Sequence, residues 1–168
     1  MNKIQIIHTE EESMKRRAAL EVDPVFPVGL HGQPDPEATL CRMLAYAEFL
    51  VALDGDEPAG LAVMYANNEE TRTAYITLFG MKPAYQRQGL GKELLAACEA
   101  LARARGMEKI RLEVTDSNLK AVRFYTRAGF VRTGACEENS SYMEKNIVKR
   151  ILTRENCRDI MTKTVEEE

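Results

Sequence analysis

The sequence has few of the features that mark exported, membrane-bound or metal-binding proteins. Its four cysteines are scattered without a C-x-x-C pair, and with only two histidines present we expect no metal site. Apolar runs such as Phe49–Leu53 are far shorter than the ~20 residues of a membrane-spanning helix. No apolar segment follows a basic one near the start, so we expect no signal peptide. These absences predict a cytoplasmic protein with reduced thiols and no membrane partner.

The sequence also lacks an excess of charge of either sign. It contains 23 Lys and Arg residues against 26 Asp and Glu residues, a net charge of −3. This balance gives no overall field that would attract nucleic acid, so we expect no nucleic-acid partner. Of the 168 residues 45% are hydrophobic, and glycine and proline number only 10 and 6, which is typical of one globular domain.

The apolar patterning predicts a mixed α/β domain, in which neighbouring strands are followed by alternating helices and strands. Asp54-Gly55-Asp56 lies between two apolar runs and predicts a hairpin. A loop is expected at residues 23–36, which hold four of the six prolines. The expected strands are 3–7, 49–53, 60–65, 73–81, 110–114, 130–133 and 142–147, and the expected helices are 10–20, 37–47, 89–105 and 118–127. We expect the domain to cover residues 1–147 and residues 148–168 to form a helical extension.

The most informative segment lies between the strand at 73–81 and the helix that follows it. The first N–H groups of a helix have no partners within the helix and lie at the positive end of its dipole. Gly89 and Gly91 remove side chains that would keep a phosphate from these N–H groups, and Arg87 and Lys92 add positive charge. The segment therefore predicts an anion site.

Two common phosphate-binding loops do not fit this segment. Glu93 stands where a Walker A loop has the Ser or Thr that holds magnesium. The glycine spacing also differs from the G-x-G-x-x-G of a Rossmann dinucleotide site. An enzyme that acts on a nucleotide phosphate is therefore disfavoured.

Gln86-Arg87-Gln88-Gly89-Leu90-Gly91 resembles the Q/R-x-x-G-x-G/A signature of the GNAT superfamily of acyl-CoA-dependent N-acyltransferases. A second region, Asn118-x-x-Ala121-x-x-Phe124-Tyr125, is similar to another motif of the family. Both occur in the family's order and spacing, and the resemblance covers residues 3–147. It implies a single α/β (α+β) domain with a twisted, mostly antiparallel mixed sheet. Six to seven strands, a V-shaped splay and about four flanking helices are expected.

The resemblance also implies an activity, the transfer of an acetyl group from acetyl-CoA to an amine by direct attack in a ternary complex. The Arg87–Lys92 backbone would hold the CoA diphosphate, and Met81 would pair with pantetheine as a further strand does. The N–H of Phe79 would polarise the thioester carbonyl, and Tyr125 would protonate the departing thiolate as general acid. The residues assigned to the cofactor in this way are Phe79, Met81, Gln86, Arg87, Gln88, Gly89, Leu90, Gly91, Lys92, Asn118, Ala121, Phe124 and Tyr125.

The general base and the acceptor are not indicated by these motifs. Tyr75 occupies the position where some family members, notably the histone-type ones, carry a glutamate. Glu113, Glu37 and His31 are candidates for this role, and a water chain or capture of the neutral amine fraction would also serve. Residues 21–47 and those around 140–146 are expected to select the acceptor, a small-molecule or peptide amine.

Two questions stay open at this point. A non-catalytic acyl-CoA sensor or interaction module would keep the glycine loop but would not need Tyr125. Dimers are common in the superfamily, so a homodimer is compatible with the resemblance.

Overall fold

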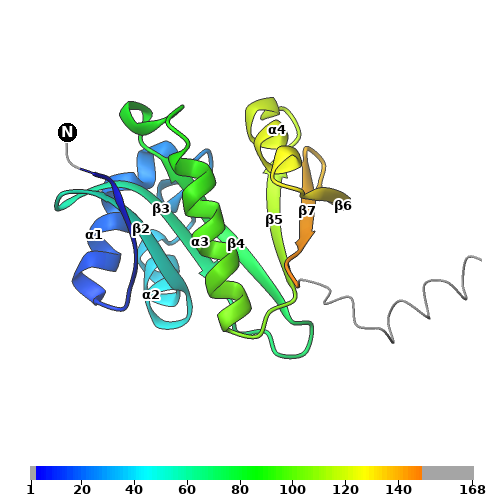
Figure 1. Cartoon of the computed structure of the whole chain (residues 1–168), viewed down its shortest axis with the longest axis horizontal. Coiled ribbons are helices and arrows are strands. Elements are labelled where there is room, and N and C mark those ends of the chain that lie inside the picture. Colours follow the sequence, from blue (N-terminus) through cyan, green and yellow to red (C-terminus); the bar gives the residue numbers. More distant parts are fainter. Residues whose placement is uncertain (1–2, 149–168) are drawn as a thin grey trace, which may run out of the picture.

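A seven-stranded sheet runs through the computed structural model, which describes residues 3–148 (Figure 1). Its strand order is β1-β2-β3-β4-β5-β7-β6, and every neighbouring pair in this sheet is antiparallel except β4 and β5. The strands are β1 Gln5–Thr9, β2 Glu48–Asp54, β3 Glu57–Tyr65, β4 Thr73–Met81, β5 Lys109–Thr115, β6 Val131–Glu137 and β7 Ser140–Asn146.

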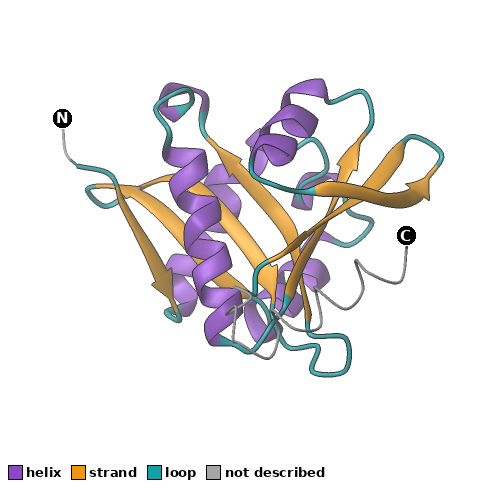
Figure 2. Cartoon of the chain, turned by 45° about the vertical axis from the view of Figure 1, so that its right-hand side comes forward, coloured by secondary structure: helices purple, strands orange, loops and turns teal. Residues whose placement is uncertain are grey.

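Two pairs of helices cover the two faces of the sheet, each with its own apolar core (Figures 1 and 2). Helices α1 (Glu12–Val22) and α2 (Pro36–Tyr46) pack on one face. Helices α3 (Leu90–Ala104) and α4 (Leu119–Arg127) pack on the other. Three 3-10 turns complete the described elements, namely η1 Asp23–Val25, η2 Leu30–Gly32 and η3 Pro83–Tyr85.

The two parallel strands diverge. Their pairing runs from Thr73 opposite Lys109 to Ile76 opposite Leu112 and ends there, although β4 continues to Met81. The expected V-shaped splay is thus present in the middle of the sheet.

A β-bulge lies in β4 at the point where the strands begin to separate. Val63 pairs with Leu78 and Met64 pairs with Ile76, so that Thr77 is an extra residue in β4. An extra residue shifts the alternation of side chains between the two faces. Ile76 therefore packs in the core beneath α3, whereas Leu78 packs in the core beneath α1 and α2.

The expected fold class is confirmed, with all seven strands and all four helices in the predicted order. The main difference is the proline-rich segment 23–36, which was expected to be a loop but contains η1 and η2. Asp23 organises this segment, since its carboxylate accepts hydrogen bonds from the backbone N–H groups of Leu30 and His31. The expected helical extension after residue 147 lies outside the described residues.

Candidate active site

A cleft of about 420 Å³ opens where β4 and β5 separate. This volume is within the range of small-molecule sites, about 300–1,000 Å³. Phe79 and Tyr125 line it from the α3/α4 face of the sheet, while Tyr75 and Glu113 line it from the α1/α2 face. The splay therefore connects the two faces of the sheet through one cleft.

The backbone of β4 is open to this cleft. The N–H of Lys82 donates to the carbonyl of Ala59 on the β3 side, at 2.8 Å. Because successive residues of a strand direct their backbone groups to opposite edges, Phe79 and Met81 direct theirs toward β5. The pairing of β4 with β5 ends at Ile76, so no β5 residue pairs with the backbone groups of Phe79 and Met81.

The segment between β4 and α3 forms a concave turn lined with N–H groups. Arg87 and Gly89 both have left-handed backbone conformations, with φ of 61° and 77°. Alternating left-handed residues direct successive N–H groups toward one point, a geometry that binds anions. Among the residues that the structure describes, none accepts a hydrogen bond from the N–H groups of residues 87–92. A Cβ atom placed on Gly89 would meet nothing within 4 Å, so the space in front of this glycine is open.

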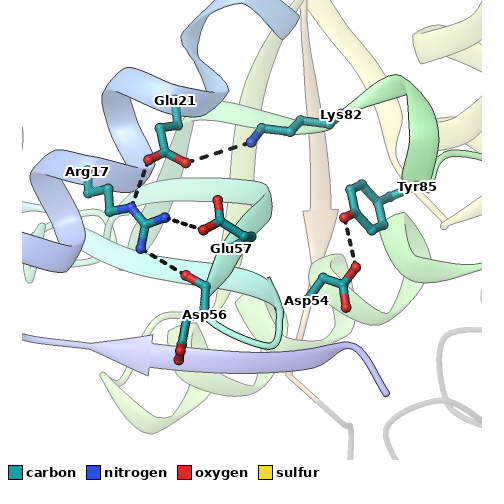
Figure 3. Close-up of polar contacts among 7 residues, drawn as sticks. All are labelled: Arg17, Glu21, Asp54, Asp56, Glu57, Lys82 and Tyr85. Carbon is teal, nitrogen blue, oxygen red and sulfur yellow. Dashed lines mark hydrogen bonds and ion pairs between the residues drawn. The ribbon is translucent and has the colours of Figure 1, made fainter. Parts of the chain in front are cut away.

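The chain that leads into this turn is held by a polar network (Figure 3). The Tyr85 hydroxyl donates to the Asp54 carboxylate at 2.9 Å, which ties η3 to the β2–β3 turn. Lys82 lies 3.8 Å from Glu21 of α1, and Glu21 accepts a 2.7 Å hydrogen bond from Arg17. Arg17 also donates to the Asp56 carbonyl and to the Glu57 carboxylate, both at 2.9 Å. Two separate segments, α1 and the β2–β3 turn, therefore fix the approach to the turn.

Four aromatic rings pack together on the α3/α4 face of the cleft, and two of them, Phe79 and Tyr125, belong to its lining. The Phe79 ring lies 5.7 Å from Phe124 and 6.0 Å from Tyr125, and Phe130 lies 5.5 Å behind Tyr125. Tyr125 is 8% exposed, and its hydroxyl forms no hydrogen bond within the described part of the chain. Burial, with a smaller contribution from the nearby Cys98 thiol, raises the pKa of Tyr125. The phenol therefore stays protonated at neutral pH.

The charged side chains of the lining lie on the opposite side of the cleft. Glu113 and Glu137 are the charged residues of the lining, and no lysine or arginine lines it among residues 3–148. The Ser140 hydroxyl donates to Glu113 at 2.6 Å, which fixes this carboxylate. Burial, together with the negative charge of Glu113, raises the pKa of Tyr75 to about 12. Tyr75 therefore remains a neutral phenol and cannot replace a carboxylate base.

The structure brings some of the predicted residues into the cleft and leaves others outside. Asn118 and Ala121 line the cleft, and the Asn118 side chain also caps α4 by accepting from the N–H of Ala121 at 3.2 Å. His31 does not line it, and its Nδ1 lies 2.8 Å from the Asp23 carboxylate. Glu37 pairs with Arg16 at 3.0 Å, outside the cleft. The residues from Gln86 to Lys92, together with Phe124 and Met81, are not in the lining; residues 86–89 form the turn after η3, and Leu90 begins α3.

Sequence reasoning missed several residues of the lining. Phe26, Pro27, Val28 and Gln33 come from the segment between α1 and α2, and Glu137 comes from β6. Phe26 and Val25 approach Gly80 of β4 so closely that a Cβ there would meet them at 3.1–3.2 Å. The composition of residues 21–47 indicated a role in acceptor selection, but no signal identified these individual side chains.

Two findings concern features other than the cleft. Within residues 3–148 no group of three or more His, Cys, Asp or Glu side chains is arranged to hold a metal ion. None of the helices in the same range is long and apolar enough to cross a membrane.

Comparison with known proteins points to one family. A family model described as acetyltransferase (GNAT) family matches residues 17–130. The spermine/spermidine N(1)-acetyltransferase of Bacillus subtilis is 31% identical over 148 residues, which cover 88% of this chain and 84% of that protein. The mycothiol acetyltransferase of Beutenbergia cavernae is 35% identical over 82 residues, which cover 49% of this chain and 27% of that protein. The match to the latter thus spans about a quarter of its length.

The fold is also that of solved acetyltransferases. A crystal structure of an acetyltransferase from Bacillus subtilis in complex with CoA superimposes with a TM-score of 0.64. The superposition covers 87% of this chain and 100% of that one, at 19% sequence identity.

Proposed function

This chain belongs to the acetyltransferase (GNAT) family, and on that premise we propose that it transfers an acetyl group from acetyl-CoA to a primary amine. The observation that carries the proposal is the position of Tyr125. Its phenol, which forms no hydrogen bond within residues 3–148, lines the splay across from β4 backbone groups that face away from β3. The carbonyl oxygen and the sulfur of a thioester both gain negative charge during acyl transfer. The β4 N–H groups suit the carbonyl oxygen, and the phenol of Tyr125 suits the sulfur.

The residues of this chain would hold acetyl-CoA in two places. The N–H groups of residues 87–92, with Arg87 and Lys92 at the rim, would bind its diphosphate. Backbone groups of Phe79 and the N–H of Met81 would pair with the peptide-like pantetheine arm, as a further strand pairs with a sheet edge. The superimposed Bacillus subtilis structure, which contains CoA, supports this assignment of the ligand.

The proposed reaction is direct attack in a ternary complex. The amine nitrogen bonds to the thioester carbonyl carbon, and the Phe79 N–H stabilises the charge that develops on the carbonyl oxygen. The carbon–sulfur bond breaks, and Tyr125 donates its proton to the departing sulfur. The proton lost by the amine passes to Glu113, directly or through water. The buried Cys98, whose pKa is raised to about 12 by burial, is a poor nucleophile and takes no part.

The acceptor we propose is a small cationic amine. Glu113 and Glu137 give the acceptor side of the cleft a negative charge, which attracts an amine with a second positive group. The spermine/spermidine N(1)-acetyltransferase, which aligns over most of this chain, supports the same acceptor class. A peptide amine is the alternative within the same reaction.

A screen for CoA release tests the proposal and separates it from its rival, a non-catalytic acyl-CoA-binding module. Purified protein is incubated with acetyl-CoA and with polyamines, monoamines, amino acids, aminosugars or peptides, and free thiol is measured. Amine-dependent thiol release, highest with diamines and polyamines, is the expected result. Tight binding of acetyl-CoA without amine-dependent release from any acceptor would favour the binding module.

A further inference from the structure

We propose that Lys120 is a further cofactor-binding residue. Its ammonium group contacts Gln86 in the free protein and the CoA diphosphate in the complex. The Lys120 Nζ donates to Gln86 Oε1 at 3.0 Å, and Gln86 Nε2 donates to the Met81 carbonyl at 2.9 Å. The inference rests on the proposed function, because it takes the turn at residues 87–92 as the diphosphate site.

These contacts form a bridge between the two walls of the V. Met81 ends β4 and Gln86 begins the turn, whereas Lys120 lies in the first turn of α4, which follows β5. Figure 1 places α4 and the N-terminus of α3 at the same end of the sheet. The bridge therefore lies between the cleft, which contains Phe79 and Tyr125, and the N–H groups that begin at Arg87. Gln86 directly precedes Arg87 and Lys120 directly precedes Ala121 of the lining, so the bridge adjoins both places.

The direction of the Gln86 side chain is fixed by its own contacts. A carboxamide has one donor end and one acceptor end. Because the donor end is bound to the Met81 carbonyl, the acceptor end faces α4 and the ammonium of Lys120. The same contact occupies that carbonyl, which would otherwise be free to pair with a pantetheine amide.

Electrostatics favour an anion over Gln86 as the partner of the Lys120 ammonium group. Two lysines within residues 3–148 pair with carboxylates, Lys145 with Glu99 at 2.6 Å and Lys82 with Glu21 at 3.8 Å. Lys120 is exposed and, within residues 3–148, forms no ion pair, since its partner is a neutral amide oxygen. Hydrogen bonds between charged groups are stronger than those to a neutral acceptor. A diphosphate in the adjacent turn is therefore a better partner for this ammonium than Gln86.

Binding measurements with fragments of the cofactor test the inference. The dissociation constants of CoA, dephospho-CoA and pantetheine are measured by titration calorimetry for the wild type and for Lys120→Ala. We expect Lys120→Ala to weaken CoA and dephospho-CoA by the same factor, about tenfold for one lost charge-assisted hydrogen bond. Pantetheine, which has no phosphate, should bind both proteins equally. The weakening should shrink as salt is added, because a charge interaction at an exposed site is screened.

Two further variants provide the controls. Lys120→Arg keeps the charge and should retain most of the affinity, while Lys109→Ala removes an exposed lysine from the opposite end of β5 and should change nothing. Gln86→Glu should weaken CoA binding, because its carboxylate would hold Lys120 in an ion pair.

The outcomes separate this inference from the function on which it rests. Unchanged CoA affinity in Lys120→Ala overturns the inference, and the proposed function stands if Gly89→Arg abolishes binding in the same assay. A loss confined to CoA, with dephospho-CoA unaffected, assigns Lys120 to the 3′-phosphate and overturns its assignment to the diphosphate. If Gly89→Arg also binds CoA normally, the proposed diphosphate site itself is wrong.

Discussion

The two sides of the cleft are built in different ways. The side facing α3 and α4 relies on backbone groups, namely those of Phe79 and Met81 in β4 and the N–H groups of residues 87–92. The side facing α1 and α2 relies on side chains from separate segments, among them Phe26, Tyr75 and Glu137. A backbone site can persist through many substitutions, whereas a side-chain site changes with each one. This difference suits a constant cofactor on one side and a family-dependent acceptor on the other.

The two sides also differ in charge. The proposed cofactor side has N–H groups without a partner among residues 3–148, next to Arg87 and Lys92 in the sequence, and the proposed acceptor side has Glu113 and Glu137. The proposed function assigns one of two ligands of opposite sign to each side, a polyanionic thioester and a cationic amine. The net charge of −3 is compatible with CoA binding because the attraction is local.

The largest expected effect comes from blocking the backbone site with Gly89→Arg. A side chain at this position would fill the open space in front of the N–H groups. Loss of about two charge-assisted hydrogen bonds should weaken CoA binding by about 10²-fold or more, measured by calorimetry. Gly106→Arg is a matched control, since Gly106 also has a positive φ (81°) and no neighbour within 4 Å of a Cβ. If both variants bind CoA equally well, the backbone site does not hold the diphosphate.

The next largest effect is expected on the chemical step. Tyr125→Phe removes the proposed acid and leaves the ring in place, so kcat should fall by about 10²-fold, as is typical for general acid catalysis. The dissociation constant of acetyl-CoA should change little. Tyr65→Phe, in a half-buried tyrosine of β3 outside the cleft lining, should leave kcat unchanged. Full activity of Tyr125→Phe across the pH range would remove this residue from the mechanism.

On the acceptor side a smaller and more selective effect is expected. Glu113→Gln should lower kcat/KM for a diamine by about tenfold, the value of one charge-assisted contact, and should affect acetyl-CoA binding little. Glu137→Gln should act in the same direction. Glu108→Gln, beside the opposite end of β5, serves as the control because Glu108 pairs with Arg72 away from the cleft. Equal losses for diamines and uncharged acceptors would argue against attraction of a second cation.

The smallest effect is the expected absence of a decline in activity at high pH. An acid must be protonated to act, and burial raises the pKa of Tyr125 above its usual value near 10. Activity should therefore rise with pH as the amine loses its proton, without a decline up to about pH 10. Steady-state kcat from pH 6 to 10 measures this. A decline beginning near pH 8 would indicate an acid with an ordinary or lowered pKa.

Much of the cofactor side could be predicted because its signals are local. The glycines at 89 and 91 stand within a few residues of the strand and the helix that they connect, so spacing alone placed the turn. The bounds of β4 agree with the expectation at both ends. The family assignment made from the two motifs is confirmed by the family model and by the relatives. The roles of the individual residues stay predictions.

The acceptor side could not be predicted in the same detail because its contacts are distant in sequence. Phe26 reaches the cleft only because Gly80 leaves room for η1 to pack on β4, a contact between residues that no local pattern relates. Glu137 reaches it through the pairing of β6 with β7. His31, one of the candidates for the general base, contacts Asp23 and is not among the residues that line the cleft.

The bulge at Thr77 makes the cofactor wall depend on the number of residues in β4. Without that extra residue, the side chains of Phe79 and Met81 would exchange faces with those of Leu78 and Gly80, and Phe79 would leave the aromatic cluster around Tyr125. A one-residue deletion here would thus do more harm than most substitutions in the same strand. Alignments and engineered chimaeras should therefore preserve the residue count through β4 before the identity of any of its side chains.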